Sequence, residues 1–180
     1  RRFLRDHHPD ETITEEIENA NCLLKRELGM LPHQHTHLEI MGVEGYSANI
    51  YFGVFKHLIL NPEFQFEKRS KRPPKDEVNA LLSFFYTLLA HDVRAALETV
   101  GLDAYVGFLH TDRPGHPSLA LDLMEELRGY LVDRFVLSVI NKRQIHKNDF
   151  IVQGENGYLI HEDTRKELIS MWQKRKKDVI

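Results

Sequence analysis

The chain has 180 residues, of which 42% are hydrophobic and 28% charged, and its formal net charge is −3. This length suits one domain with a real core, and the absence of repeats and low-complexity segments excludes a fibrous or repeat protein. The charge balance is less basic than that of most non-specific nucleic-acid binders. Cys22 is the single cysteine, which suits the cytoplasm. No apolar stretch reaches the roughly 18 residues of a membrane span, and no signal-peptide pattern is present, so we expect no membrane partner.

Hydrophobic periodicity predicts a mainly α fold in which one helical lobe spans residues 1–180. Apolar residues recur at helical spacing, which predicts helices over about 12–28, from about 40 to the break at Asn61-Pro62, over 76–100, from the expected N-cap Ser118 to Arg128, over 130–143 and from about 163 onward. A charged, proline-containing connection occupies residues 64–75. Apolar segments on either side of Gly154–Gly157 predict one small β-hairpin near residues 150–160.

The segment from Gly107 to Arg128 carries a possible metal site. An apolar run leads to His110, and the helix that follows has Asp122 and Glu125 as i, i+3 neighbours. Two carboxylates this close repel each other unless a cation or solvent separates them, and a nearby histidine completes a ligand set suited to Mn²⁺ or Mg²⁺. An amphipathic helix with a solvated acidic face is the alternative interpretation.

Glu44 is a second unusual acid. Helical spacing puts it on an otherwise apolar face with Ala48, Tyr51 and Phe55. A carboxylate on such a face is costly unless it is paired, protonated or bound to a metal. Pairing with an arginine and binding of a metal both remain open.

Three segments, MGVEGYSANIYFGVF, RPPKDEVNALLSFFYTLLAHDV and GLDAYVGFLHTDRPGHPSLALDLMEELR, resemble in this order the carboxy-terminal helical lobe of the CRISPR-associated protein one family. The resemblance extends from about Ile17 to Trp172. The family comprises metal-dependent DNA endonucleases and integrases that insert new spacers into CRISPR arrays. The resemblance therefore implies an enzyme of CRISPR adaptation in the prokaryotic cytoplasm, one that joins DNA 3′-hydroxyl ends to the array by phosphodiester transesterification.

The resemblance also implies a set of site residues. The family's ligands for Mn²⁺ or Mg²⁺ fall on Glu44, His110 and Glu125, and a further catalytic acid falls on Asp122. Asn79 matches an asparagine that supports the site from behind the ligands. Weaker signals for DNA contact come from basic residues in or near loops, namely Arg113, Lys71, Arg72, Lys142 and Arg143.

The implied partners are protospacer and CRISPR-repeat DNA, CRISPR-associated protein two, and a second copy of the chain in the full-length protein. Family members begin with a β-rich lobe and continue as helix beyond the segment Trp172–Lys177. We therefore expect a fragment that keeps the ligands but lacks much of the surface for dimer formation and partner docking.

Two other classes of function compete with this interpretation. One is a catalytically silent helical module that binds DNA or a protein. The other is a metal phosphohydrolase of the HD type, because His91-Asp92 resembles its paired ligands. Zinc or nickel binding by three alternate histidines, His33, His35 and His37, is a further alternative.

Overall fold

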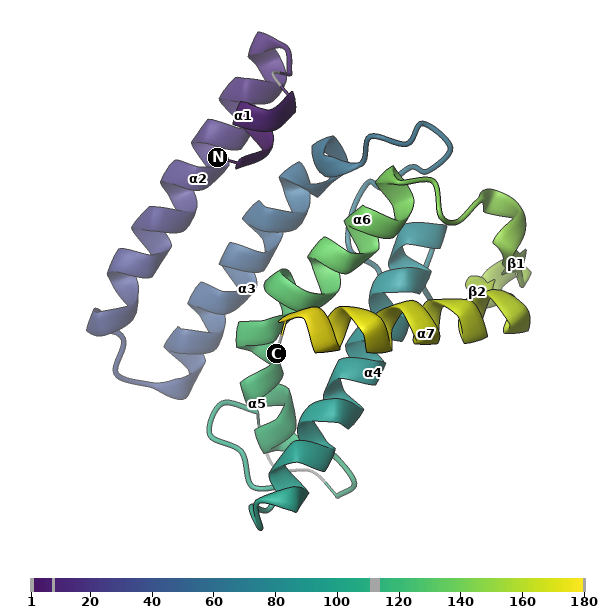
Figure 1. The fold of residues 1–180 in the computed structure, drawn as a ribbon. Coiled ribbons are helices and arrows are strands. Elements are labelled where there is room, and N and C mark those ends of the chain that lie inside the picture. Colours follow the sequence, from purple (N-terminus) through teal and green to yellow (C-terminus); the bar gives the residue numbers. More distant parts are fainter. Residues whose placement is uncertain (1, 8, 111–113, 180) are drawn as a thin grey trace. The chain divides into compact units, whose positions relative to one another are not determined.

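The computed structural model (Figure 1) describes residues 2–7, 9–110 and 114–179. The protein is mainly helical with one small antiparallel hairpin, which confirms the predicted fold class. The contacts divide the chain into two compact units, Arg1–Leu60 with Phe66–Arg69 and Asn61–Gln65 with Ser70–Ile180. A single lobe over residues 1–180 stays a prediction.

The first unit is built on a pair of packed helices, α2 and α3. The side chain of Asp10 starts α2 by accepting a hydrogen bond of 2.8 Å from the backbone N–H of Ile13. Thr36 and Glu39 form a reciprocal capping box at the start of α3. The helices of this unit are α1 (Arg2–His7), α2 (Glu11–Met30) and α3 (His37–Phe55), with 3-10 turns at Leu31–His33 and Lys56–Leu58.

The core of the first unit is small and aromatic. Phe55 is fully buried, and its ring centroid lies 5.6 Å from that of Phe52 and 5.1 Å from that of Phe66. Ile17 and Ala20 are the buried apolar residues of α2. Most other side chains of α3 are only partly buried or exposed.

The second unit is organised around a long buried helix, α4. Asp76 caps this helix by accepting a hydrogen bond of 2.7 Å from the backbone N–H of Asn79. The elements of this unit are α4 (Glu77–Thr99), α5 (Ser118–Leu127), α6 (Arg134–Asn141), β1 (Phe150–Val152), β2 (Tyr158–Ile160) and α7 (Glu162–Val179), with 3-10 turns at Lys147–Asp149 and Gly154–Asn156.

An aromatic cluster fixes α7 on α4 and α6. The Trp172 ring lies 5.5 Å from the rings of both Phe85 and Phe135, and the Phe85 and Phe135 rings are 4.8 Å apart. Asp92 on α4 accepts hydrogen bonds from Trp172 Nε1 at 3.1 Å and from Lys176 Nζ at 2.8 Å. These contacts give Asp92 of the His91-Asp92 pair a structural role that does not involve a metal.

The helices α5 and α6 belong to one continuous helical run. A π-helical segment, Arg128–Asp133, joins them where the sequence predicted two separate helices. The prediction of Ser118 as the N-cap is wrong: Ser118 is the first residue of α5, Pro117 precedes it, and the buried Ser118 hydroxyl donates to the His116 carbonyl at 3.3 Å. Because Ser118 is buried, its hydroxyl bonds back to the preceding loop instead of capping the helix.

The predicted hairpin is confirmed, with Phe150 opposite Ile160 in antiparallel register. Gly157 closes the turn with a φ of 83°, a conformation that favours glycine. A Cβ atom at this position would also collide with the carbonyl oxygen of Pro74. Glycine is therefore required at residue 157 on two separate grounds.

One described helix, α4, is long and apolar enough to cross a membrane when only length and composition are considered. In the sequence we looked for an unbroken apolar stretch and therefore did not single out this helix. Val78, Leu81 and Phe85 of the same helix are fully buried, however, and the core helix of a soluble protein passes the same test. The finding is weak evidence for a membrane span, and we interpret α4 as a core helix.

Candidate functional site

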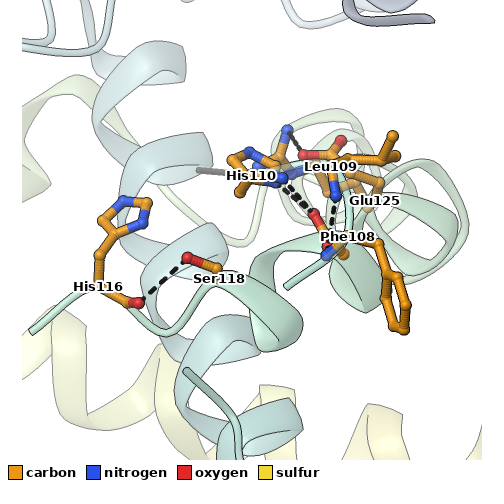
Figure 2. A network of polar contacts seen from close by, with 8 residues as sticks. Phe108, Leu109, His110, His116, Ser118 and Glu125 are labelled. Atoms are coloured by element: carbon orange, nitrogen blue, oxygen red, sulfur yellow. Dashed lines mark hydrogen bonds and ion pairs between the residues drawn. The ribbon is translucent and has the colours of Figure 1, made fainter. Parts of the chain in front are cut away.

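Asp122 of α5 binds the loop that carries His110. Its Oδ2 accepts hydrogen bonds from the backbone N–H groups of Phe108 at 2.6 Å and Leu109 at 2.9 Å. Its Oδ1 accepts from the backbone N–H of His110 at 2.9 Å and lies 2.6 Å from Nδ1 of the same residue. Figure 2 shows Phe108, Leu109 and His110 gathered at one place in this network of contacts. Both oxygens of Asp122 are thus occupied in holding the loop and the imidazole.

These contacts change the acidity of Asp122. Burial raises the pKa of this carboxyl, whose side chain is only 9% exposed. The hydrogen bonds from Leu109, from the His110 ring and from the backbone of Phe108 and His110 lower the pKa, and together they outweigh burial. The net effect is a pKa below the ordinary aspartate value, because every one of these donors favours the ionised form. Asp122 is therefore a weak base in this environment.

Gly107 allows the loop to approach α5 closely. A Cβ atom at residue 107 would lie 2.6 Å from Cβ of Ser118, 2.8 Å from its carbonyl carbon and 3.0 Å from Oδ2 of Asp122. Real Cβ atoms do not make such contacts. Only glycine lets the three N–H groups of residues 108–110 reach the Asp122 carboxylate.

The hydrogen bond to Asp122 fixes the His110 ring. Because a carboxylate only accepts, Nδ1 of His110 carries the proton in this assignment, and the Nε2 lone pair of a neutral ring remains for another partner. The side chain is 27% exposed, so an incoming group can reach it. A carboxylate behind a histidine in this manner is the usual way in which proteins orient a metal-binding imidazole.

Glu125 lies one turn after Asp122 and forms an ion pair with Arg128, whose Nη1 is 2.6 Å from Glu125 Oε1. The Arg128 guanidinium also sits 5.1 Å from the centre of the Tyr86 ring. The Tyr86 hydroxyl in turn donates to Asp133 at 2.6 Å. This chain of contacts links α5 and the π segment to α4, and it gives Glu125 a cationic partner already.

Sequence reasoning overlooked Arg128 and His116. Arg128 follows Glu125 by three residues, a helical spacing that favours an ion pair. The sequence alone could therefore have predicted this pair. The His116 ring lies 6.4 Å from the His110 ring, and its buried Nδ1 has no hydrogen-bond partner in the part of the chain that the structure describes. No local pattern indicates that contact, because it depends on the path of the intervening loop.

Glu44 belongs to the first unit, on α3, whereas His110, Asp122 and Glu125 belong to the second. The Glu44 side chain is exposed, so the desolvation cost expected from its apolar helix face does not arise. Within residues 2–7, 9–110 and 114–179, no three His, Cys, Asp or Glu side chains gather closely enough to hold a metal ion. A metal set of Glu44, His110 and Glu125 therefore stays a prediction, and so does zinc or nickel binding by His33, His35 and His37.

Asn79 is fully buried in the first turn of α4. Its Oδ1 accepts a hydrogen bond of 2.9 Å from the backbone N–H of Ser70, and its Nδ2 donates to Asp76 at 2.6 Å. These contacts tie Asn79 to the loop before α4. A supporting role for Asn79 behind the metal ligands stays a prediction.

The residues with weaker signals for DNA contact lie mostly on the surface. Lys71 and Arg72 are exposed in the loop before α4, and Lys142 and Arg143 are exposed after α6. Arg143 has a φ of 54°, which is unusual for a residue other than glycine. Arg113 lies outside the residues that the structure describes.

Comparison with known proteins shows the family of this chain. The family model described as CRISPR associated protein Cas1 matches residues 1–174. The chain is similar to CRISPR-associated endonuclease Cas1 1 of Chlorobaculum tepidum, with 49% identity over 181 residues that cover 99% of this chain and 52% of the relative. The chain thus spans about half the length of the curated relatives it matches first.

Two solved structures have the same fold. One is a casposase bound to integration product, with a TM-score of 0.76 and 30% identity, covering 83% of this chain and 43% of that one. The other is a chain of a partial Cas6-RT-Cas1 and Cas2 complex, with a TM-score of 0.83 and 30% identity, covering 90% of this chain and 49% of that one. On the match of the family model to residues 1–174, the chain belongs to the CRISPR associated protein Cas1 family.

Proposed function

We propose that this chain carries the catalytic chemistry of a divalent-metal-dependent DNA endonuclease and integrase of CRISPR adaptation. The observation that supports it most is the contact between Asp122 and His110, which fixes the imidazole with Nε2 as its remaining nitrogen lone pair. In this proposal Glu44, His110 and Glu125 hold Mn²⁺ or Mg²⁺, because an N/O set that leaves positions open suits these cations. The bound cation would stabilise charge on a phosphodiester oxygen during in-line displacement.

Two of the proposed donors, His110 and Glu125, belong to the second unit and suit such a cation once Glu125 is released from Arg128. His110 offers an oriented nitrogen and Glu125 a carboxylate that is 23% exposed. Arg128 now neutralises Glu125, so the ion pair has to open or share the carboxylate when the cation binds. Asp122 keeps its hydrogen bonds throughout and acts as a positioning residue, since its pKa is lowered and both oxygens are occupied.

The reaction that these residues would serve exchanges one ester bond for another. In strand joining, the oxygen of a DNA 3′-hydroxyl forms a bond to a phosphorus of the CRISPR repeat, and the bond from that phosphorus to its own 3′-oxygen breaks. The attacking hydroxyl gives up a proton and the leaving oxygen gains one. In cleavage, water replaces the 3′-hydroxyl. Protospacer and repeat DNA, CRISPR-associated protein two, a second copy of the chain and a cytoplasmic location complete the proposal.

The resemblance to a casposase bound to integration product supports strand joining as the reaction class. The resemblance to a chain from a complex that contains Cas2 supports the protein partner. A silent DNA- or protein-binding module remains the second candidate, because Glu125 already has a structural partner in Arg128 and Asp122 is fully used in holding the loop.

Calorimetric titration of this chain with Mn²⁺ tests the proposal. We compare the wild type with Glu44→Ala, His110→Ala and Glu125→Ala, and with Glu126→Ala as the control, because Glu126 is an exposed acid of the same helix. The expected result is saturable binding that the three site variants lose and the control keeps, with circular dichroism showing that all remain folded. Joining of a labelled 3′-hydroxyl oligonucleotide to repeat DNA should follow the same order. Binding that survives all three changes would favour the silent module.

A further inference from the structure

A basic groove lies between α6 and α7 of the second unit, in a region that the proposed metal site does not use. It encloses about 400 Å³. Cations from both helices and from the turn that follows α6 line it, namely Arg134, Lys142, Lys174 and Arg175. Asp178 is the one carboxylate among the lining residues. For a chain with a net charge of −3, this is a local concentration of positive charge.

The cations of the groove have no acidic partner among the described residues, whereas several other cations of the chain do. Arg94 pairs with Glu98, Arg128 with Glu125 and Lys176 with Asp92. By contrast, none of the four groove cations forms an ion pair with any residue that the structure describes. Like charges held together repel one another, so this arrangement favours an anionic ligand.

The basic run Lys174–Lys177 divides between two roles. Lys176 is bound to Asp92 of α4 and helps to hold α7 in place. Lys174 and Arg175 line the groove, whereas Lys177 is exposed and does not. The run is therefore more than a uniformly solvated helix face, and Lys177 can serve as a control for Lys174.

The turn after α6 brings further donors to the groove. The N–H of Gln144 bonds the carbonyl of Val139 at 3.0 Å and that of Arg143 bonds the carbonyl of Ile140 at 3.0 Å, which is the Schellman pattern of a helix end. This pattern gives Arg143 its positive φ, and the residues on either side, Lys142 and Gln144, both line the groove. Arginine, lysine and neutral amide or hydroxyl donors are the groups that bind phosphates of nucleic acids.

We propose that the groove between α6 and α7 binds the phosphodiester backbone of a DNA strand, as a contact surface separate from the reacting centre. This inference rests on the proposed function, since that function makes DNA the anion at hand. Phosphate contacts of this kind position a strand without reading its sequence, and their strength falls with salt.

The test is the binding of a short fluorescent single-stranded oligonucleotide to this chain, measured by anisotropy with EDTA present so that metal plays no part. The groove variant is Lys142→Gln with Lys174→Gln. The control is Lys147→Gln with Lys177→Gln, which also removes two positive charges, but from exposed residues that do not line the groove. Between about 50 and 200 mM salt, two lost contacts should flatten the slope of log affinity against log salt by about 1.4.

We expect the groove variant to bind about 10-fold more weakly and the control to stay within about twofold of the wild type, by the usual strength of phosphate contacts. A readout on the wild type avoids any doubt about folding: bound DNA should protect Lys142 and Lys174, but not Lys147 and Lys177, from amine acetylation detected by mass spectrometry. Equal weakening by both variants, equal protection of all four lysines, or no DNA binding at all would overturn the inference.

Failure of the groove inference and failure of the proposed metal chemistry can be told apart. If the groove variant binds DNA like the wild type while Mn²⁺ titration still depends on His110, only the groove inference fails. If the lysines are protected as expected but no Mn²⁺ binds, only the proposed function fails. Binding of an acidic protein in place of DNA would appear as the absence of oligonucleotide binding.

Discussion

Nδ1 of His110 and Oδ1 of Asp122 lie 2.6 Å apart, and the same carboxylate accepts the backbone N–H groups of residues 108–110. The histidine and the loop that carries it are therefore held by one side chain from α5. Any change at Asp122 alters both the path of the loop and the direction of the imidazole. This coupling makes the position of His110 sensitive to residues that never touch a ligand.

Asp122→Asn should weaken both folding and metal binding. Asparagine offers one acceptor oxygen and places an NH₂ group against the backbone donors, so at least one of the three N–H groups loses its partner. We expect the free energy of unfolding to fall by about 1–3 kcal/mol and Mn²⁺ affinity to fall about 10–100-fold. Urea denaturation and calorimetry measure the two effects. Glu126→Gln, on the exposed side of the same helix, should change neither.

The contribution of Asp122 should depend on pH in a defined direction. Its pKa in the folded protein is lowered, so the ionised carboxylate stabilises the fold above the unfolded pKa of about 3.9. That stabilisation is lost as the pH falls through the lower pKa of the folded state. The difference in unfolding free energy between the wild type and Asp122→Asn should be constant near neutrality and should shrink below about pH 4. A difference that grows in acid would contradict the assignment.

Gly107→Ala should displace the loop from α5. The added Cβ atom would lie 2.6 Å from Cβ of Ser118 and 2.8 Å from its backbone carbonyl carbon, and neither can move freely at the start of a helix. We expect a loss of about 1–3 kcal/mol in the free energy of unfolding, together with weaker Mn²⁺ binding. Gly29→Ala in α2 is the matched control, because its Cβ would meet nothing within 4 Å. It should raise stability by about 0.5–1 kcal/mol.

Arg128→Gln should tighten Mn²⁺ binding while it weakens the fold. The guanidinium neutralises Glu125 at 2.6 Å and would repel a cation bound to that carboxylate. Two unit charges about 4 Å apart interact by about 1–4 kcal/mol near a protein surface, so removing one should raise the affinity several-fold. Loss of the contact with the Tyr86 ring should lower the unfolding free energy by about 1 kcal/mol. Weaker Mn²⁺ binding would instead show that Arg128 holds Glu125 in a ligand position.

Much of the local structure followed from patterns a few residues long. The periodic apolar residues of α2 and α4 and the start of α4 at Asp76 depend on neighbours within one helical turn. The hairpin depends on two apolar segments around Gly154–Gly157. Where a local rule failed, a distant contact was the reason. Ser118 is buried and packs closely against the loop at Gly107, 11 residues earlier, which replaced its expected role as a cap.

The sequence by itself determined the mainly helical class, the hairpin, the adjacency of Asp122 and Glu125 and, through three long motifs, the family. Only the tertiary structure decided which side chains contact one another across the chain. Asp122 orients His110 across 12 residues of chain, Asp92 holds Trp172 across 80, and the cations of α6 and α7 line one groove. The physical reason is the range of the interactions: periodicity and capping act within a turn of helix, whereas a hydrogen bond or a charge acts on whatever side chain the completed fold brings within reach.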